Sequence, residues 1–137
     1  MSLLGVFDVS GSALSAQSVR LNVTSSNLAN AETVSSSIDQ TYRARHPIFA
    51  TVLDAFNDHP SMAGVKVKAI VESKEELRMR YEPQHPMANE KGYIFLPNVN
   101  PIEEMANMIS ASRSYQNNVE AINTSRQLLL ATLRLGQ

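Results

Sequence analysis

Residues 100–136, NPIEEMANMISASRSYQNNVEAINTSRQLLLATLRLG, form the stretch of this 137-residue chain that decides its fold. Asn100 suits a helix N-cap, Pro101 suits the first helical position, and the two glutamates that follow place negative charge at the positive end of the helix dipole. No glycine or proline interrupts the sequence before Gly136, and glycine commonly ends helices. The stretch predicts one helix from about 101 to 135, roughly 50 Å long.

Two rows of large apolar side chains recur at seven-residue intervals near the two ends of the chain. The first row is Phe7, Leu14, Leu21 and Leu28, and the second is Met108, Tyr115, Ile122 and Leu129. This spacing is typical of helices that pack lengthwise against other helices. The full apolar stripe predicted for the C-terminal helix is Met105, Met108, Ile109, Tyr115, Val119, Ile122, Leu129 and Leu133. The helix either packs on its own domain or joins a bundle of several chains, and its length favours the bundle.

The segment that carries the first row is poor in charge. Before Asp39 the only charged residues are Asp8, Arg20 and Glu32, and small or uncharged polar residues dominate. Burial of four large side chains yields about 2 kcal/mol each, whereas ordering the chain costs about 1 to 2 kcal/mol per residue. We therefore predict that residues 5–30 are mobile in the isolated chain and become helical when packed against partners.

The middle of the chain predicts strands. Apolar and charged residues alternate in residues 64–72, GVKVKAIVE, and in residues 77–82, LRMRYE, which is typical of half-exposed strands. Residues 93–96, YIFL, are a third candidate, and prolines bound these segments. We expect one small antiparallel sheet that forms a knob between two helical arms.

At 137 residues and 43% hydrophobic content, the chain has the size of one ordinary domain. The predicted fold class is mainly α with a small β insertion. Long N- and C-terminal helices form a coiled-coil-like bundle, and a small antiparallel β domain lies between them. The predicted divisions are an N-terminal assembly helix at 1–34, a small β-containing middle region at 35–100 and a C-terminal assembly helix at 101–137.

Composition excludes several classes of function. Twelve basic and 13 acidic residues give a net charge of −1, which does not favour nucleic acid or anionic lipid as a partner. Cysteine is absent, so disulfides, thiolate zinc sites and cysteine nucleophiles are excluded. We expect no membrane insertion and no cleaved secretory signal, because neither pattern is present. A protein whose export route reads an uncleaved N-terminus would share these features.

The residues that carry chemistry are scattered. His46, His59 and His85 each precede a proline in a different segment, without the spacing of a metal site. The adjacent acid pairs Glu75-Glu76 and Glu103-Glu104 do not face each other across a substrate, and we interpret them as a solvated turn and a helix-start charge. Ser35, Ser36 and Ser37 lack a nucleophile motif, and no phosphate-binding loop exists. We predict no enzyme activity, no metal and no cofactor.

Four segments together carry a family resemblance. They are residues 26–33, SNLANAET, residues 42–49, YRARHPIF, residues 85–93, HPMANEKGY, and residues 97–116, PNVNPIEEMANMISASRSYQ. The chain closely resembles the bacterial flagellar basal-body rod, or axial, protein family nearly from end to end. The first element is shared across rod and hook proteins, whereas YRARHP and HPMA narrow the match to proximal-rod members. Val34 and a serine run replace the Pro-Gly-Tyr of many axial relatives, which weakens a match to hook or distal-rod proteins.

The resemblance implies a structural subunit of the proximal rod. Such proteins are exported unfolded through the flagellar type III apparatus without signal cleavage and polymerise helically through their terminal helices. The rod crosses the periplasmic space, transmits torque from motor to hook and encloses the export channel. The implied partners are copies of this chain, other rod proteins and the surrounding basal-body rings.

The apolar rows and the resemblance together define a predicted assembly interface. Its members are Phe7, Leu14, Leu21, Asn27, Leu28, Asn30, Met105, Met108, Tyr115, Val119, Ile122, Leu129 and Leu133. The apolar members form the packed core, and the two asparagines are hydrogen-bonding contacts at the end of the first helix. Two alternatives stay open: a non-polymerising helical adaptor or export chaperone of a type III system, and a small hydrolase or metal enzyme that uses the three histidines.

Overall fold

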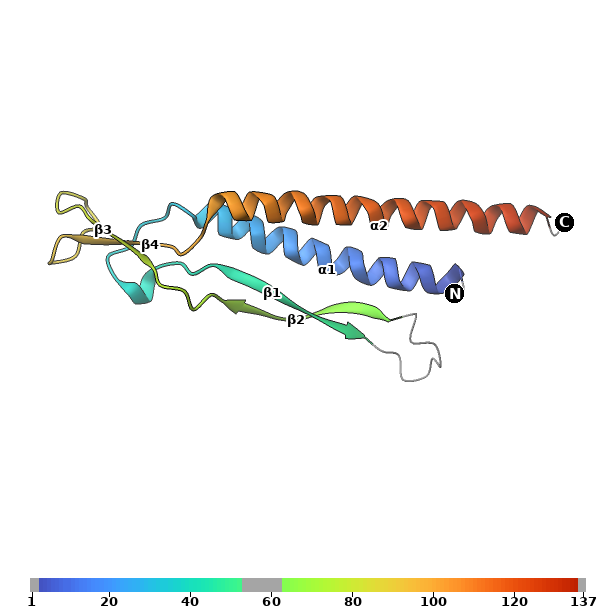
Figure 1. Ribbon diagram of the computed structural model, residues 1–137, viewed down its shortest axis with the longest axis horizontal. Helices are drawn as coiled ribbons and strands as arrows, with labels where there is room; N and C mark the ends of the chain where they lie inside the picture. The colour runs from blue at the N-terminus through green and yellow to red at the C-terminus, as the bar shows by residue number, and fades with distance from the viewer. Residues whose placement is uncertain (1–2, 53–62, 136–137) are drawn as a thin grey trace.

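The computed structural model describes residues 3–52 and 63–135, which form two long helices and two pairs of strands. Helix α1 (Leu3–Asn30) lies between helix α2 (Pro101–Leu135) and the antiparallel pair β1 (Arg45–Val52) and β2 (Gly64–Glu72) (Figure 1). Strands β3 (Arg78–Tyr81) and β4 (Tyr93–Leu96) lie beyond the first turn of α2, at one end of the molecule. The predicted fold class, two long terminal helices with a small antiparallel β region between them, is confirmed.

Helix α2 begins where the sequence predicts and runs without interruption to Leu135, the last described residue. The side-chain oxygen of Asn100 accepts a hydrogen bond from the Ile102 N–H at 3.1 Å, and the Asn100 carbonyl accepts one from the Glu104 N–H at 3.0 Å. The side-chain bond satisfies an amide that has no partner within the helix. The 35 residues of α2 make a rod about 52 Å long.

Helix α1 covers the predicted N-terminal segment. It ends at Asn30, whose carbonyl accepts hydrogen bonds from the Thr33 N–H at 3.1 Å and the Thr33 hydroxyl at 2.8 Å. In the middle of α1, the Ser12 hydroxyl accepts a bond from the Val65 N–H of β2 at 3.1 Å and donates to the Val9 carbonyl at 2.8 Å. Small polar side chains of α1 therefore attach it to the neighbouring strands.

Small and polar side chains account for most of what the two helices bury. They are Ser10, Ala16, Val23, Thr24 and Asn27 in α1, and Glu104, Ala111 and Ser125 in α2. The helices run in opposite directions side by side (Figure 1), and the Arg20 guanidinium of α1 donates to the Asn107 side-chain oxygen of α2 at 3.1 Å. This bond fixes which turns of the two helices lie level with each other.

The β region differs from the prediction in its sheet topology. The three predicted strands form, but β2 pairs with a strand that was not predicted, β1, whereas β3 pairs with β4 in a separate sheet. Strand β1 escapes detection because Pro47 interrupts it and apolar residues follow one another without alternation. The pair β1–β2 packs along α1 rather than forming part of a knob between the helices.

A small core lies where α1 ends and α2 begins. Ala31, Ala44 and Val99 form a buried cluster against which Tyr42 packs. Beside it, Ser35 and Phe95 exchange backbone hydrogen bonds at 3.0 and 2.9 Å, which ties the segment after α1 to strand β4. This junction holds the adjacent ends of both helices.

Candidate assembly interface

The side chains in the apolar row of α1 are each partly covered by the chain itself and partly exposed to solvent. Phe7, Leu14, Leu21 and Leu28 are all partly buried, and none is fully buried. Helix α1 packs against α2 on one side and against β1 and β2 on another. The remaining surface is free for a neighbouring subunit, so the row stays a predicted interface.

The stripe of α2 keeps more free surface than that of α1. Met108, Ile122 and Leu129 are partly buried, whereas Met105, Ile109, Tyr115, Val119 and Leu133 are exposed. The residues that α2 does bury lie four positions before members of its apolar row: Glu104 before Met108, Ala111 before Tyr115 and Ser125 before Leu129. Residues four apart are neighbours on the surface of a helix. The apolar row therefore runs alongside the surface that α2 buries against the rest of the chain. Exposed large apolar side chains in such a position are typical of an interaction surface, so the α2 stripe stays a predicted interface.

The C-terminal end of α2 protrudes beyond α1 (Figure 1). With the register set by Arg20 and Asn107, Leu3 lies level with about residue 124, so α2 extends roughly 16 Å further at 1.5 Å per residue. Leu128, Leu130, Leu133 and Leu135 are exposed on this end, Leu133 by 62% and Leu135 by 87%. The heptad pattern identified only Leu133 among them, because leucines on several sides of a helix break the seven-residue spacing.

Asn27 is buried inside the chain, with 0% of its surface exposed. Its side-chain oxygen accepts hydrogen bonds from the Arg45 N–H at 3.0 Å and the Tyr42 hydroxyl at 2.9 Å, and its amide nitrogen donates to the Arg45 carbonyl at 2.8 Å. These bonds join the last turns of α1 to the first residue of β1. In this structure Asn27 holds the fold and is fully buried, whereas its predicted place in the assembly interface stays a prediction.

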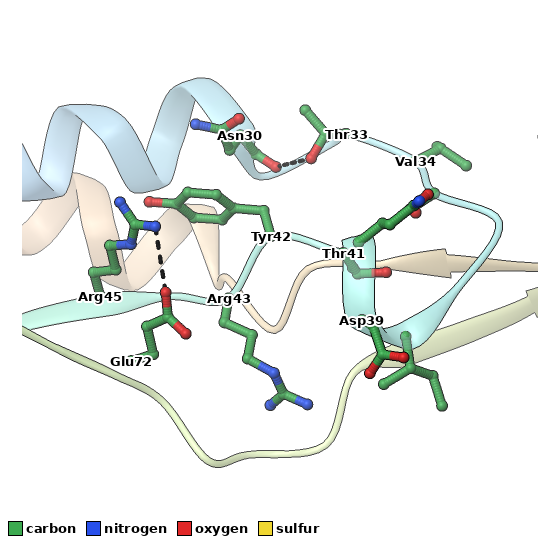
Figure 2. Close-up of a pocket in the computed structure, with 12 residues that line it drawn as sticks. Asn30, Thr33, Val34, Asp39, Thr41, Tyr42, Arg43, Arg45 and Glu72 are labelled. Atoms are coloured by element: carbon green, nitrogen blue, oxygen red, sulfur yellow. Dashed lines mark hydrogen bonds and ion pairs between the residues drawn. The ribbon is translucent and has the colours of Figure 1, made fainter.

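Asn30 lies at the rim of an open polar cavity of about 620 Å³ next to the end of α1 (Figure 2). Its amide nitrogen donates to the Ser26 carbonyl at 2.8 Å, and the rest of the residue is partly exposed. Across the cavity, Arg45 and Glu72 form an ion pair at 3.3 Å with about half of each side chain exposed. Asn30 therefore remains available as a contact with another subunit.

The serine and threonine hydroxyls that line this cavity donate to backbone carbonyls. Thr33 donates to the Asn30 carbonyl at 2.8 Å, Thr41 to the Ser37 carbonyl at 2.7 Å, and Ser35 to the same Ser37 carbonyl at 3.3 Å. A hydroxyl becomes a nucleophile when a neighbouring base accepts its proton. The arrangement supports a structural role for these groups.

Arg78 connects the two helix ends, a role that the sequence pattern did not indicate. Its guanidinium donates to the carbonyls of Pro97 at 3.1 Å, Ala31 at 3.4 Å and Val99 at 3.4 Å. The Asn98 side chain accepts a bond from the Ala44 N–H at 2.8 Å in the same region. The connection from α1 to β1 and the connection from β4 to α2 are thereby fixed to each other.

Two of the three candidate metal ligands fall within the described residues. His46 lies on β1, His85 accepts a bond from the Met87 N–H at 3.1 Å through its Nδ1, and His59 falls outside the described residues. Within residues 3–52 and 63–135, no three histidine, aspartate or glutamate side chains lie close enough to hold a metal ion. In the same part of the chain, neither helix combines the length and apolar character that a bilayer crossing requires.

Comparison with protein families gives matches on both helices. Residues 7–34 match the family model described as flagella basal body rod protein, and residues 90–135 match that of the flagellar basal body rod FlgEFG protein C-terminal region. The first match covers most of α1, and the second runs from just before β4 to the end of α2. The two regions that carry the apolar rows are thus the regions with family matches.

Comparison with curated proteins gives matches over the whole chain. The flagellar basal-body rod protein FlgC of Escherichia coli O157:H7 is 50% identical over 139 aligned residues, with all of both chains covered. FlgC of Salmonella typhimurium is 48% identical over 137 residues, again with both chains fully covered. FlgC of Borreliella burgdorferi is 35% identical, with 100% of this chain and 99% of that protein covered.

Proposed function

The chain belongs to the FlgC family of flagellar basal-body rod proteins, and from this membership we propose that it polymerises helically through its terminal helices. Its role is that of a structural subunit of the rod. We further propose that it occupies the proximal rod in the periplasmic space. On this proposal it reaches that position through the flagellar type III apparatus without loss of a signal segment.

One observation carries the polymerisation proposal. The contact within the chain buries small and polar side chains such as Ala111 and Ser125, whereas the large side chains Met105, Tyr115 and Leu133 stay exposed on the same helix. A self-contained helical domain would bury its largest apolar side chains first, because burial yields about 25 cal/mol for each Å² of apolar surface. Burial of small side chains with exposure of large apolar ones is expected of a subunit whose apolar rows are buried by its neighbours.

The mechanical task of a rod fits this arrangement. Long helices that lie nearly along one axis share load over an extended contact, and densely packed interfaces transmit strain because they compress little. Helix α1 is held on two sides, by α2 and by β1 and β2. Once assembled, each subunit would therefore contribute a stiff three-layered element. The proposed shaft transmits torque and encloses the export channel.

The proposed partners follow from the same surfaces. Assembly with other rod components is implied by family membership. We propose that the apolar rows contact copies of this chain and other rod proteins, and that the basal-body rings surround them. The role requires no catalysis, cofactor, nucleic acid or membrane insertion.

Photocrosslinking in assembled rods tests the proposal. A benzoylphenylalanine in place of Tyr115 should link this chain to a terminal helix of a neighbouring rod subunit in isolated basal bodies. The reason is that Tyr115 lies in the exposed part of the α2 row. Capture only within the chain, or only in a small complex of defined size outside the rod, would contradict polymerisation. The second result would favour the adaptor alternative.

A further inference from the structure

Arg126 lies within the apolar stripe of helix α2. It follows Val119 by seven residues and precedes Leu133 by seven, and both of these belong to the predicted interface. Residues seven apart lie on nearly the same side of a helix, so the three side chains share one row. Val119 is 37% exposed, Leu133 is 62% exposed, and Arg126 is exposed as well. The surface proposed to contact a neighbouring subunit therefore contains a positive charge.

The described part of the chain supplies no carboxylate to Arg126. Residues 121–135 contain no acidic residue. The ion pairs found among residues 3–52 and 63–135 are Arg45 with Glu72 and Arg80 with Glu82. Asp8, the acidic residue of α1, lies level with about residue 119 in the register of the two helices. That level is roughly 10 Å along the helix axis from Arg126 at 1.5 Å per residue.

The leucines next to Arg126 determine what happens to its charge in an assembly. Leu129 and Leu130 follow it by three and four residues, so all three are neighbours on the helix surface. Leu130 is 45% exposed and Leu129 is partly buried. A neighbouring subunit that covers these leucines also removes Arg126 from water, which is strongly unfavourable for a charge without a partner. A carboxylate is the acceptor whose geometry matches both sides of a guanidinium.

We propose that Arg126 selects the partner of the α2 stripe: a helix of an adjacent rod subunit whose apolar face presents a carboxylate opposite Arg126. This inference rests on the proposed function, because it requires the stripe to be buried between subunits. A single charge in an apolar row fixes the register of packed helices, since any other register leaves the charge without its partner. Arg126 thus determines which helix packs on the stripe and at which height, whereas the apolar side chains supply the buried area.

Substitutions at Arg126 separate a charge pair from a contact that is only apolar. Arg126→Leu leaves the partner's carboxylate unpaired and should lower the number of completed rods per cell about tenfold. Arg126→Lys keeps the charge and should hold the number within about threefold of the parent chain. The matched control is Arg113→Leu, which changes an exposed arginine of the same helix outside the stripe and should have less than about a twofold effect.

Two results would overturn the role of Arg126. Rods at the parental number with Arg126→Leu would show that the stripe needs no charge at this position. Equal losses with Arg126→Leu and Arg126→Lys would show that the charge is not what the partner recognises. Circular dichroism of the purified full-length variants checks that each folds like the parent chain.

Zero-length crosslinking identifies the carboxylate. In isolated basal bodies that contain Arg126→Lys, a carbodiimide should join the introduced amine to the carboxylate in contact with it. Mass spectrometry of the joined peptides should place that carboxylate in a helix of another rod subunit, whereas Arg113→Lys should give no such link. A link to Asp8, or no link at all, would overturn the proposal. Photocrosslinking from Tyr115 in the parent chain reports on burial of the stripe itself, so failure of the proposed function is distinguished from failure at Arg126.

Discussion

Asn27 is bonded to Arg45 as one strand is bonded to the next in a sheet. The side-chain oxygen of Asn27 accepts from the Arg45 N–H at 3.0 Å, and its amide nitrogen donates to the Arg45 carbonyl at 2.8 Å. A side-chain amide presents a donor and an acceptor side by side, as a peptide unit does. The asparagine thus satisfies both backbone groups at the start of β1 and orients the strand pair along α1.

Asn27→Ala should lower the free energy of unfolding by about 2 kcal/mol, because the N–H and carbonyl of Arg45 and the Tyr42 hydroxyl each lose a hydrogen-bond partner. Urea denaturation of the purified full chain measures the loss. The matched control is Asn30→Ala, which removes a partly exposed amide bonded to the Ser26 carbonyl and should cost less than about 1 kcal/mol. Equal effects of the two substitutions would contradict the role assigned to Asn27.

Leu21→Asp should abolish incorporation into rods while the region from Tyr42 to Pro97 stays folded. A charge without a partner costs about 3 kcal/mol or more when it is buried at an interface, and the cost recurs in every copy. Rod formation is scored by electron microscopy of isolated basal bodies. Lys66→Ala and Glu75→Ala change exposed residues and should have little effect. Normal rods with Leu21→Asp would rule out the α1 row as an interface.

Amide hydrogens of residues 5–30 should exchange faster in the dilute isolated chain than those of residues 93–99. Helix α1 buries mainly small side chains such as Ala16 and Ser10, whereas β4 and the segment after it bury Ile94, Phe95 and Val99. Local opening is easier where less apolar surface is buried. Exchange measured by mass spectrometry compares the two segments within one sample. Slower exchange in α1 than in β4 would contradict coupled folding and assembly.

Arg78→Ala should lower the free energy of unfolding by about 2 kcal/mol, because the carbonyls of Ala31, Pro97 and Val99 lose a charged donor. Arg80→Ala is the control on the same strand. Arg80 pairs with Glu82 at 2.8 Å, but more than a third of each side chain is exposed, so its loss should cost less than about 1 kcal/mol and be screened by salt. Urea denaturation at low and high salt separates the two arginines. Similar losses would show that Arg78 does not join the helix ends.

The helices could be predicted from the sequence because their signals are local. Asn100 and Pro101 mark the start of α2, and the lack of glycine and proline from Ile102 to Leu135 accounts for its length. Strand β1 could not be predicted in this way, since it exists through its pairing with β2 and its contact with α1. Pairing between distant segments has little effect on the spacing of apolar residues within either segment.

In the candidate site too, features with local signals could be predicted and features that depend on distant contacts could not. The heptad pattern found the large apolar side chains that α2 leaves exposed or partly exposed, such as Tyr115 and Leu129. It could not find the role of Asn27 or Arg78, because their partners are backbone groups 15 or more residues away along the chain. Asparagine near a helix end and arginine in an alternating strand are common at surfaces, so composition alone does not indicate that either side chain bonds distant backbone groups.

Gly92→Ala and Gly11→Ala should change stability in opposite directions. Gly92 has a φ of 78°, and a Cβ there would lie 2.8 Å from the Tyr81 ring and 3.1 Å from the Pro83 Cβ. Left-handed backbone and this overlap should together cost about 2 kcal/mol and disturb the packing of Tyr81 against Tyr93, whose ring centres lie 5.2 Å apart.

A Cβ at Gly11 meets nothing within 4 Å, and alanine in a helix interior is favoured over glycine by about 0.5 to 1 kcal/mol. Gly11→Ala should therefore raise the helix content and the free energy of unfolding of the isolated chain, measured by circular dichroism and urea denaturation. If Gly11→Ala also lowers incorporation into rods, the free space at Gly11 is filled by a neighbouring helix in the assembly. A loss of stability in the isolated Gly11→Ala chain would contradict the exposed helical position assigned to Gly11.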